Sequence, residues 1–377
     1  MIIEKFGVAD YRNIQKAFIT PAPGVTVLCG KNGQGKTNML EAINIFAQGR
    51  AYRTRREREL IRGVSGMSSD YAVAEGETPP CAHLKLTWLD RELRNEQELY
   101  IARDTSKNDG STVKKMLRNG SPITKMTDFI GRFRAVLFSP EHLSLVKGGP
   151  GERRTFLDLA ISQFNPVYLG SLQRYNALLA QRNALLRDWK RTTPAMQQSL
   201  YTYSPRMARE AALITKTRDD YIRRLDEHMR NIVAEMTGGH ERLRINYDGA
   251  RTEEQFDKIF NDYIARDIEN GTTGAGPHRE DFTLIMNGVP ARTLASQGQQ
   301  RTVTLAMKLS EGEIARELSG EYPVFLFDDV LSEIDAGRRN YILSALDGRQ
   351  VIITACEDTI KADRVYRVSL GKFSDGE

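Results

Sequence analysis

The sequence predicts an α/β protein in which a mainly helical segment interrupts one α/β domain. Strand-like apolar runs alternate with helical spacing in the first 150 residues and again after about residue 280. Between these two stretches, apolar residues recur at helical spacing. We therefore expect one half of the α/β domain at 1–148, an inserted helical arm at 149–270 and the second half at 271–377.

The first half is organised around a glycine-rich turn at residues 30–37. This turn matches G-x-x-x-x-G-K-[ST], the pattern of a phosphate-binding loop. A strand-like apolar run at 25–29 precedes it, and apolar residues at helical spacing follow it. Strand, loop and helix suit this chemistry, because backbone N–H groups can wrap phosphates and the helix N-terminus adds positive potential. We expect nucleotide binding by Gly30, Lys31, Asn32, Gly33, Gln34, Gly35, Lys36 and Thr37, with Lys36 reaching the β- and γ-phosphates and Thr37 ligating Mg²⁺.

The remaining elements follow in chain order. Residues from about 70 to 120 look β-rich, with Leu84, Leu86 and Trp88 alternating and a hairpin signal at 119–120. A short strand at 135–138 comes before the breaker at 148–151. Helical stripes follow between residues 166 and 194 and at 222–236, and a capping box begins at residue 252. We expect helices of at most about 30 residues, roughly 45 Å long, that pair within the chain rather than form an intermolecular coiled coil.

The second half holds two further signals. An apolar strand at 324–327 ends in Asp328 and Asp329, and ligands bind at the carboxyl ends of such strands. Asp328 is the candidate partner of Mg²⁺, directly or through water, and Asp329 would orient or deprotonate an attacking water. Ser296 and Gln299 match a capping box before a helix at 302–317. Helix capping alone would explain the serine, and the alternative is that this helix start is a second anion-binding site. A helix at 337–346 and strands at 351–354 and 365–370 complete the pattern.

The bulk properties favour a polyanionic partner and no membrane. The net charge is +5, the isoelectric point is about 9.0, and no apolar run approaches the length of a membrane span. We therefore expect a cytoplasmic protein, with its three cysteines acting as small buried apolar residues. Arginines crowd one segment after the phosphate loop. Arg50, Arg53, Arg55 and Arg56 are candidate contacts to nucleic-acid phosphates, the alternative being a solvated surface.

The motifs together resemble a known family. Residues 30–37 resemble a Walker A motif, 296–300 an ABC-type signature, 324–329 a Walker B motif and 331–335 a D-loop, the plan shared by ABC, SMC and Rad50 ATPases. The stretches at 49–54, 137–141, 153–158 and 276–282 are similar to those of the RecF family of bacterial recombination mediators. The resemblance covers essentially the whole chain. It implies an ABC-type ATPase head of mixed β-sheets and helices with a short helical arm.

The resemblance also implies a mechanism. RecF-like proteins form a homodimer on binding ATP, so Ser296, Gly298 and Gln299 of one copy would contact the γ-phosphate held at Lys36 of the other. Lys36 and Asp329 would be the catalytic residues of a weak, DNA-stimulated ATPase that acts as a switch. The implied partners are single-stranded DNA, gapped or junction duplex DNA, and RecR acting with RecO. The implied outcome is loading of RecA onto gaps, with support for replication restart and SOS induction.

Three alternative functions make different demands on the sequence. A transporter ATPase is disfavoured by the helical insertion, by aspartate at 329 and by the lack of a histidine after the strand at 351–354. A nuclease-partner or SMC-type chromosome protein would need long coiled-coil arms, which 377 residues exclude. A structural adaptor without hydrolysis stays open, and it predicts that Asp329→Asn leaves DNA loading intact.

Overall fold

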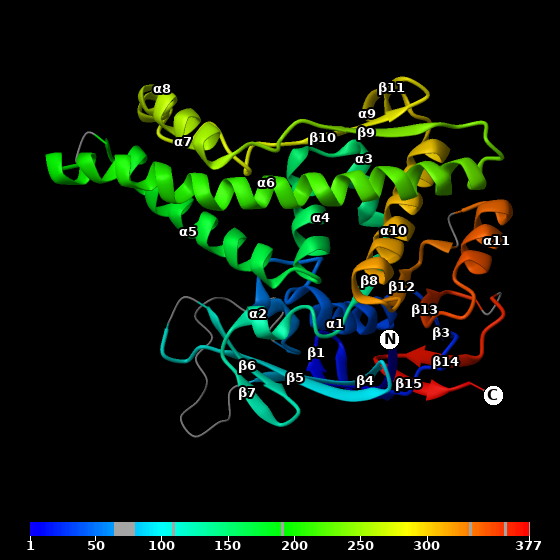
Figure 1. Cartoon of the computed structure of the whole chain (residues 1–377). Helices are drawn as coiled ribbons and strands as arrows, with labels where there is room; N and C mark the ends of the chain where they lie inside the picture. The colour runs from blue at the N-terminus through cyan, green and yellow to red at the C-terminus, as the bar shows by residue number, and fades with distance from the viewer. Residues whose placement is uncertain (64–79, 108–109, 190–191, 332–333, 358–359, 377) are drawn as a thin grey trace. The chain divides into compact units, whose positions relative to one another are not determined.

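The computed structural model describes residues 1–63, 80–107, 110–189, 192–331, 334–357 and 360–376 (Figure 1). The chain forms two compact units, one made of Met1–Glu141 with Glu311–Glu377 and the other of His142–Ser310. The first unit is α/β and the second is mainly helical, which confirms the predicted α/β protein with a helical insertion. The division by sequence assigned residues 271–310 to the α/β domain, whereas compactness groups them with the helical unit.

The first unit contains two six-stranded sheets and a central helix. Its elements are β1 (Ile2–Tyr11), β2 (Ile14–Ile19), β3 (Val25–Cys29), α1 (Lys36–Gln48), a 3₁₀ turn (Glu57–Leu60), β4 (Cys81–Asp90), β5 (Leu93–Arg103), β6 (Thr112–Arg118), β7 (Ser121–Ile123), α2 (Met126–Phe129), β8 (Ala135–Phe138), β12 (Val324–Asp328), α11 (Ala336–Ala345), β13 (Val351–Ala355), β14 (Arg364–Ser369) and β15 (Lys372–Asp375).

One sheet has the order β15-β14-β3-β13-β12-β8, and its strands from β14 to β8 run parallel. Strands β3 and β12 are about 300 residues apart in sequence but share β13 as a neighbour. All five residues of β12 are buried, as expected for a continuous apolar run inside a parallel sheet. Because parallel strands end at a common edge, the loop after β3 and the carboxylates at the end of β12 emerge at the same edge of the sheet, with β13 between them.

The other sheet is antiparallel, with the order β2-β1-β4-β5-β6-β7. The predicted hairpin turn at Asn119 and Gly120 joins β6 to β7, and both residues have positive φ, as a tight primed turn requires. Helix α1 contacts strands of both sheets, β1 and β4 on one side and β8, β12 and β13 on the other. Ten of its thirteen residues are buried, so the helix that follows the phosphate loop is also the centre of the core.

The second unit is built on two long helices and a small sheet. Its elements are α3 (Ser144–Lys147), α4 (Pro150–Ser162), α5 (Pro166–Arg187), α6 (Pro194–Met236), β9 (Leu243–Tyr247), α7 (Glu253–Asp262), α8 (Ile264–Asn270), β10 (Phe282–Met286), β11 (Val289–Pro290), α9 (Ala291–Leu294) and the first part of α10 (Gln297–Ser319).

Helix α6 corrects the predicted limit on helix length. It has 43 residues, which is about 64 Å at 1.5 Å per residue, and Pro205 lies inside it. The apolar stripe continues on both sides of this proline, since Leu200, Met207 and Ile214 are fully buried. That burial offsets the hydrogen bond that proline removes, so the helix does not end there. The partners of α6 include α5, α7 and β9 of the same chain, which confirms the intramolecular pairing.

The small sheet, of order β11-β10-β9, lay partly outside the prediction. Strand β10 lies where strand-like runs were expected to return, after about residue 280, but β9 falls in a stretch expected to be helical. It is a five-residue alternating segment that pairs with β10 along its whole length. Its pairing partner lies about 40 residues further along the chain, which a local pattern does not reveal.

Candidate functional site

The glycine-rich loop has the predicted strand–loop–helix geometry. It leaves β3 and enters α1, with Gly33 at φ 77° and Gly35 at φ 112°, a region that favours glycine. Gly30 lies against the neighbouring strand, where a Cβ atom would meet the backbone oxygen of Val368 at 2.3 Å. The glycines are thus required by backbone conformation at two positions and by close packing at a third.

Lys36 is a buried basic residue whose side chain is bonded to backbone oxygens of the loop. Its side chain is held by the backbone oxygens of Gly30 and of Lys31, the second at 3.0 Å, and the residue is only 5% exposed. Within the described ranges, no carboxylate lies at ion-pair distance from its Nζ atom. A buried charge normally has a charged partner, so this arrangement fits an anionic ligand in the loop.

Two turns hold the loop from outside. The Asn13 side chain, between β1 and β2, donates to the Gly33 oxygen at 3.2 Å. At the turn between β14 and β15, the Leu370 N–H donates to Gln34 Oε1 at 2.7 Å. The Cys356 thiol, after β13, lies 3.1 Å from Asn32 Oδ1.

Cys356 is exposed and Cys81 is half-buried, so the expectation of three buried cysteines is wrong for both and correct for Cys29.

Asp328, at the carboxyl end of β12, accepts hydrogen bonds from three hydroxyl groups. Its Oδ1 accepts from Thr37 at 2.7 Å and from Thr354 at 3.0 Å. Its Oδ2 accepts from the Tyr52 hydroxyl at 2.8 Å. The structure thus joins the predicted Thr37–Asp328 pair and places the Thr354 hydroxyl there as well. Asp329 follows with φ 55°, and its N–H donates to the Thr354 hydroxyl at 2.9 Å.

Tyr52 is a functional candidate that the sequence did not reveal. Burial, followed by the charge of Asp328, raises the pKa of Tyr52 well above its ordinary value. The phenol therefore stays protonated and donates to the carboxylate. Its contact joins residues 276 positions apart, which no local pattern indicates.

The residues at this edge suit Mg²⁺ in their chemistry. Among the described residues, no group of three or more His, Cys, Asp or Glu side chains forms a metal cluster. Mg²⁺ in nucleotide sites uses one or two protein oxygens together with phosphates and water. The Thr37 hydroxyl and the Asp328 carboxylate provide such a pair.

A buried carboxylate lies one helical turn beyond the loop. Glu41 is fully buried and accepts from the Tyr11 hydroxyl at 2.9 Å, from the Arg12 guanidinium and from Arg53 Nη2 at 3.0 Å. Burial alone would raise the pKa of Glu41, but the hydrogen bonds from Arg12 and Arg53 outweigh it and hold that pKa below its usual range. Arg53 also binds the Asn38 side chain, so this arginine is attached to α1.

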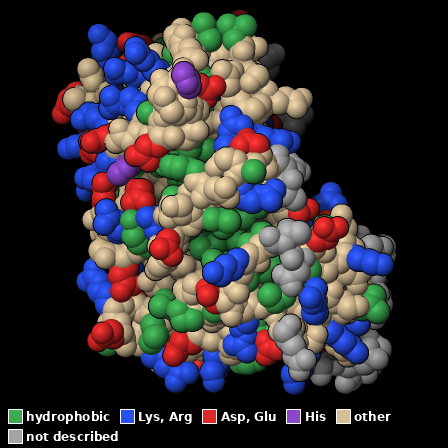
Figure 2. Space-filling model, turned by 90° about the vertical axis from the view of Figure 1, so that its right-hand side faces the viewer, with side chains coloured by type: hydrophobic (Ala, Val, Ile, Leu, Met, Phe, Trp, Pro, Cys, Tyr) green, Lys and Arg blue, Asp and Glu red, His purple; other side chains and the backbone are tan. Residues whose placement is uncertain are grey.

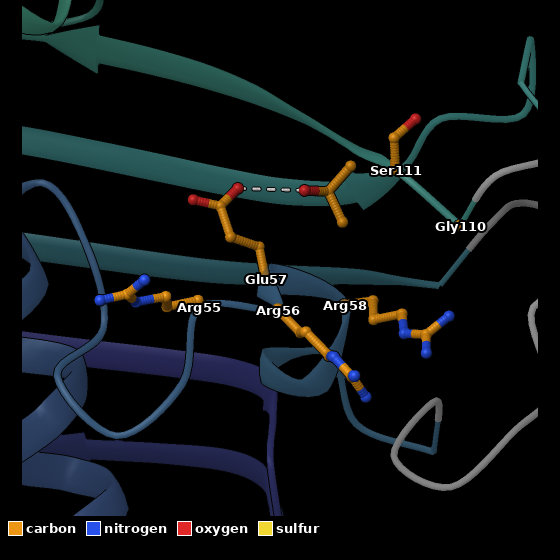
Figure 3. A pocket seen from close by; sticks show the side chains of 7 residues that line it. Arg55, Arg56, Glu57, Arg58, Gly110 and Ser111 are labelled. Atoms are coloured by element: carbon orange, nitrogen blue, oxygen red, sulfur yellow. Dashed lines mark hydrogen bonds between the residues drawn. The ribbon is translucent and has the colours of Figure 1, made fainter. Parts of the chain in front are cut away.

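Arg55 and Arg56, two of the four arginines predicted to contact phosphates, line a surface hollow. Arg55, Arg56 and Arg58 surround a space of about 560 Å³ together with Glu57 and residues 110–112. Figure 3 shows the side chains of Arg55 and Arg58 pointing away from one another. Their guanidinium groups are thus spread out instead of converging on one point, as suits several phosphates along a backbone.

The acidic residue of the hollow is already paired. Glu57 accepts from the Thr112 hydroxyl at 3.0 Å and forms an ion pair with Lys114 (Figure 3 shows the first contact). Its charge is therefore compensated from β6 and does not neutralise the arginines. Elsewhere, as on the face drawn in Figure 2, basic and acidic side chains are interspersed. The Arg53 side chain is bonded to Glu41 of α1, and the exposed Arg50 follows the end of that helix. Neither arginine is among the residues that line the hollow.

The signature-like segment lies in the second unit. The Ser296 N–H donates to Gln299 Oε1 at 2.8 Å, and the Gln299 N–H donates to Ser296 Oγ at 3.2 Å. This reciprocal pair is the predicted capping box, and it begins α10 just before Gly298. In the D-loop-like segment, Ser332 and Glu333 lie outside the described residues.

The two family-like stretches of the second unit are joined in its interior. Arg153 forms a two-pronged ion pair with Asp281, with both N···O distances at 2.7 Å. His278 has both ring nitrogens engaged, one with the Tyr175 hydroxyl at 2.8 Å and one with the Thr273 oxygen at 3.0 Å. These residues therefore serve the packing of the helical unit.

The comparisons with known proteins agree with this architecture. The family model described as the RecF/RecN/SMC N terminal domain matches residues 2–373. An Smc head domain from Pyrococcus furiosus has the same fold, with a TM-score of 0.55 at 16% identity and 96% of that chain covered. The class defined by loop, sheet and carboxylates is therefore that of the SMC-like head ATPases.

Full-length relatives narrow this class. A protein of Clostridium acetobutylicum described as "DNA replication and repair protein RecF" is 34% identical, with all of both chains covered. A solved structure described as the recombination mediator protein RecF-ATPrS in the RecFOR pathway has a TM-score of 0.87 at 30% identity, and covers 100% of this chain and 98% of its own. This chain belongs to the RecF family.

Of the described helices, none combines the length and apolar character needed to span a membrane.

Proposed function

We propose that this chain is an ATP-dependent DNA-binding protein of recombinational DNA repair. The observation that carries the proposal is that one compact unit holds both Lys36, which is buried and bonded to backbone oxygens of the loop, and the arginine-lined hollow. Its RecF relatives are described as DNA replication and repair proteins, and one solved RecF structure is described as RecF-ATP. An anionic ligand in the loop and a polyanion on the hollow would make nucleotide and DNA the two ligands of this unit.

The loop residues, Gly30 to Thr37, would hold ATP by their N–H groups and by the Lys36 charge. Thr37 and Asp328 would hold Mg²⁺, directly or through water. Bound Mg²⁺ and ATP would supply charge compensation and a cleavable phosphate bond. Asp329 would orient or deprotonate the attacking water, in a weak DNA-stimulated ATPase that acts as a switch.

The start of α10 would complete the site in a homodimer. Ser296, Gly298 and Gln299 stand at a helix N-terminus, which attracts anions. Ser296 is exposed, so it is available to a second copy. In the proposed dimer, these residues of one copy contact the nucleotide at Lys36 of the other.

The DNA partner would be single-stranded DNA and the junctions of gapped duplex, bound without sequence preference. Spread guanidinium groups contact phosphates, which carry no base information. RecR, acting with RecO, is the proposed protein partner. The proposed outcome is loading of RecA at gaps, with support for replication restart and SOS induction.

Sedimentation with and without ATP tests the nucleotide and dimer parts. We expect wild-type protein to dimerise with ATP and Lys36→Ala to stay monomeric, because it removes the charge facing the phosphates. Ser296→Arg should bind ATP as a monomer but fail to dimerise. ATP-dependent dimers of Lys36→Ala would contradict the role of Lys36. Unfolding of Ser296→Arg would assign Ser296 to helix capping alone.

Charge reversal tests the DNA part. We expect Arg55→Glu with Arg56→Glu to weaken binding of a gapped duplex and to reduce the salt slope of log K by about 2, one per lost phosphate contact. The matched control is Arg206→Glu with Arg209→Glu, which makes the same charge change at a smaller hollow of the helical unit, about 280 Å³ in volume. Equal weakening by both pairs would mean that the hollow is not the DNA site.

A further inference from the structure

Two consecutive residues attach the arginine segment to the nucleotide loop. Tyr52 donates to Asp328 Oδ2 at 2.8 Å, and Arg53 binds Glu41 of α1 at 3.0 Å. The Arg53 guanidinium also lies 5.7 Å from the centre of the Tyr52 ring. The chain therefore leaves the loop site from two anchored side chains before it reaches Arg55.

The next residues form a short turn that side chains hold in place. The Thr54 hydroxyl donates to Glu59 Oε2 at 2.7 Å and accepts from the Arg56 N–H at 3.0 Å. The Glu59 N–H donates to the Arg56 oxygen at 2.9 Å and closes the 3₁₀ turn. Arg55, Arg56 and Arg58 thus stand on a braced turn that begins two residues after the contact between Tyr52 and Asp328.

The two oxygens of Asp328 face different parts of the molecule. Oδ1 accepts from Thr37 of the loop and from Thr354 of β13. Oδ2 accepts from Tyr52, which belongs to the arginine segment. A movement of this carboxylate toward a ligand bound in the loop would change the one hydrogen bond that it makes with that segment.

We propose that Tyr52 is a positioning residue that couples occupancy of the nucleotide loop to the placement of the arginine hollow. The proposal rests on the function proposed above. Its physical content is one hydrogen bond followed by a braced turn, a continuous path of the kind that carries coupling between sites. Because coupling is reciprocal, DNA on the hollow would change nucleotide affinity by the same factor.

Tyr52→Phe tests this inference, because it removes one hydroxyl and keeps the ring. The measurement is the dissociation constant of a labelled gapped duplex with and without Mg²⁺–ATPγS, and of a fluorescent ATP analogue with and without that DNA. Coupling factors between sites commonly lie between about 5 and 150. We expect one in this range for wild-type protein and a value below about 3 for Tyr52→Phe.

Tyr322→Phe is the matched control, since it also removes a tyrosine hydroxyl that donates to a carboxylate, Glu313 at 3.0 Å, in the same unit. It should keep the wild-type coupling factor. Thr54→Val provides a second route, because it loosens the turn without touching Asp328, and it should also lower the factor.

The outcomes separate the two proposals. A wild-type protein that binds no DNA would overturn the proposed function, and the inference with it. Wild-type coupling that is retained in both Tyr52→Phe and Thr54→Val would overturn the inference alone. Should Tyr52→Phe not fold, Thr54→Val decides by itself.

Discussion

The helical unit is expected to lose stability in mild acid because of His278. Its Nε2 lies 3.0 Å from the Thr273 oxygen, which can only accept, so this nitrogen carries the proton. Nδ1 then accepts from the Tyr175 hydroxyl at 2.8 Å. Burial, reinforced by the charges of Arg279 and Arg154, lowers the pKa of His278 to about 4 despite the hydrogen bond to Thr273. The folded unit thus requires the neutral ring.

The size of the effect follows from the difference between the two states. The ordinary histidine pKa is 6.5, so below that pH the unfolded chain binds a proton that the folded unit rejects. The stabilisation is present above pH 6.5 and is lost as the pH falls toward 4. The linkage relation gives a loss of about 2 kcal/mol between pH 7 and pH 5, approaching about 3 kcal/mol below pH 4.

Urea unfolding at pH 7 and pH 5 measures this loss. His278→Gln keeps a polar side chain but cannot titrate, so its free energy of unfolding should fall by about 2 kcal/mol less over this interval than that of wild-type protein. His240→Gln replaces an exposed histidine of the same unit and should follow the wild type. Equal pH dependence for His278→Gln and wild type, or a His278 ring that titrates near pH 6.5 by NMR, would refute the reasoning.

Three further changes test the buried charges and the loop. Glu41→Gln should lower the free energy of unfolding by about 3–5 kcal/mol, measured by urea titration, because Arg12 and Arg53 lose their shared carboxylate. Asp267→Asn should cost a similar amount, since it leaves the fully buried Arg182 uncompensated, and replacing both by Met and Leu should recover most of it. Gly30→Ala should destabilise the protein by about 1–3 kcal/mol and abolish the rise in Tm caused by ATP, because its Cβ overlaps the Val368 oxygen.

Local signals account for what the sequence predicted well. The loop, the strand at 324–327 and the capping boxes at residues 252 and 296 each depend on residues within about ten positions. The physics of these features is short-range, since glycine conformation, strand burial and helix capping are decided by neighbours. Membership of a parallel sheet then places Asp328 beside the loop without further information.

Features that depend on distant pairs were not predictable from one sequence. By sequence, Glu41 is a polar residue of an amphipathic helix. In the structure it is buried, because Arg12 from the turn after β1 and Arg53 from beyond the helix both pair with it. The hollow needs residues 110–112 as well as the arginines. Helix α6 exceeded its predicted length because burial on both sides outweighed one proline.

The placement of Arg53 changes how the basic segment must be tested. By sequence it is one of several arginines facing DNA, but its side chain closes the Glu41 cluster. Reversing it would set a glutamate against a buried glutamate and would disturb α1, the helix that begins at the phosphate loop. Loss of DNA binding in an Arg53 variant would therefore not identify a DNA contact. Arg55 and Arg56 line the hollow and lie outside the Glu41 cluster, but Arg56 is also 4.0 Å from Glu59 of the braced turn. Arg55→Glu compared with Arg206→Glu therefore gives the cleaner separation of phosphate contact from damage to the nucleotide site.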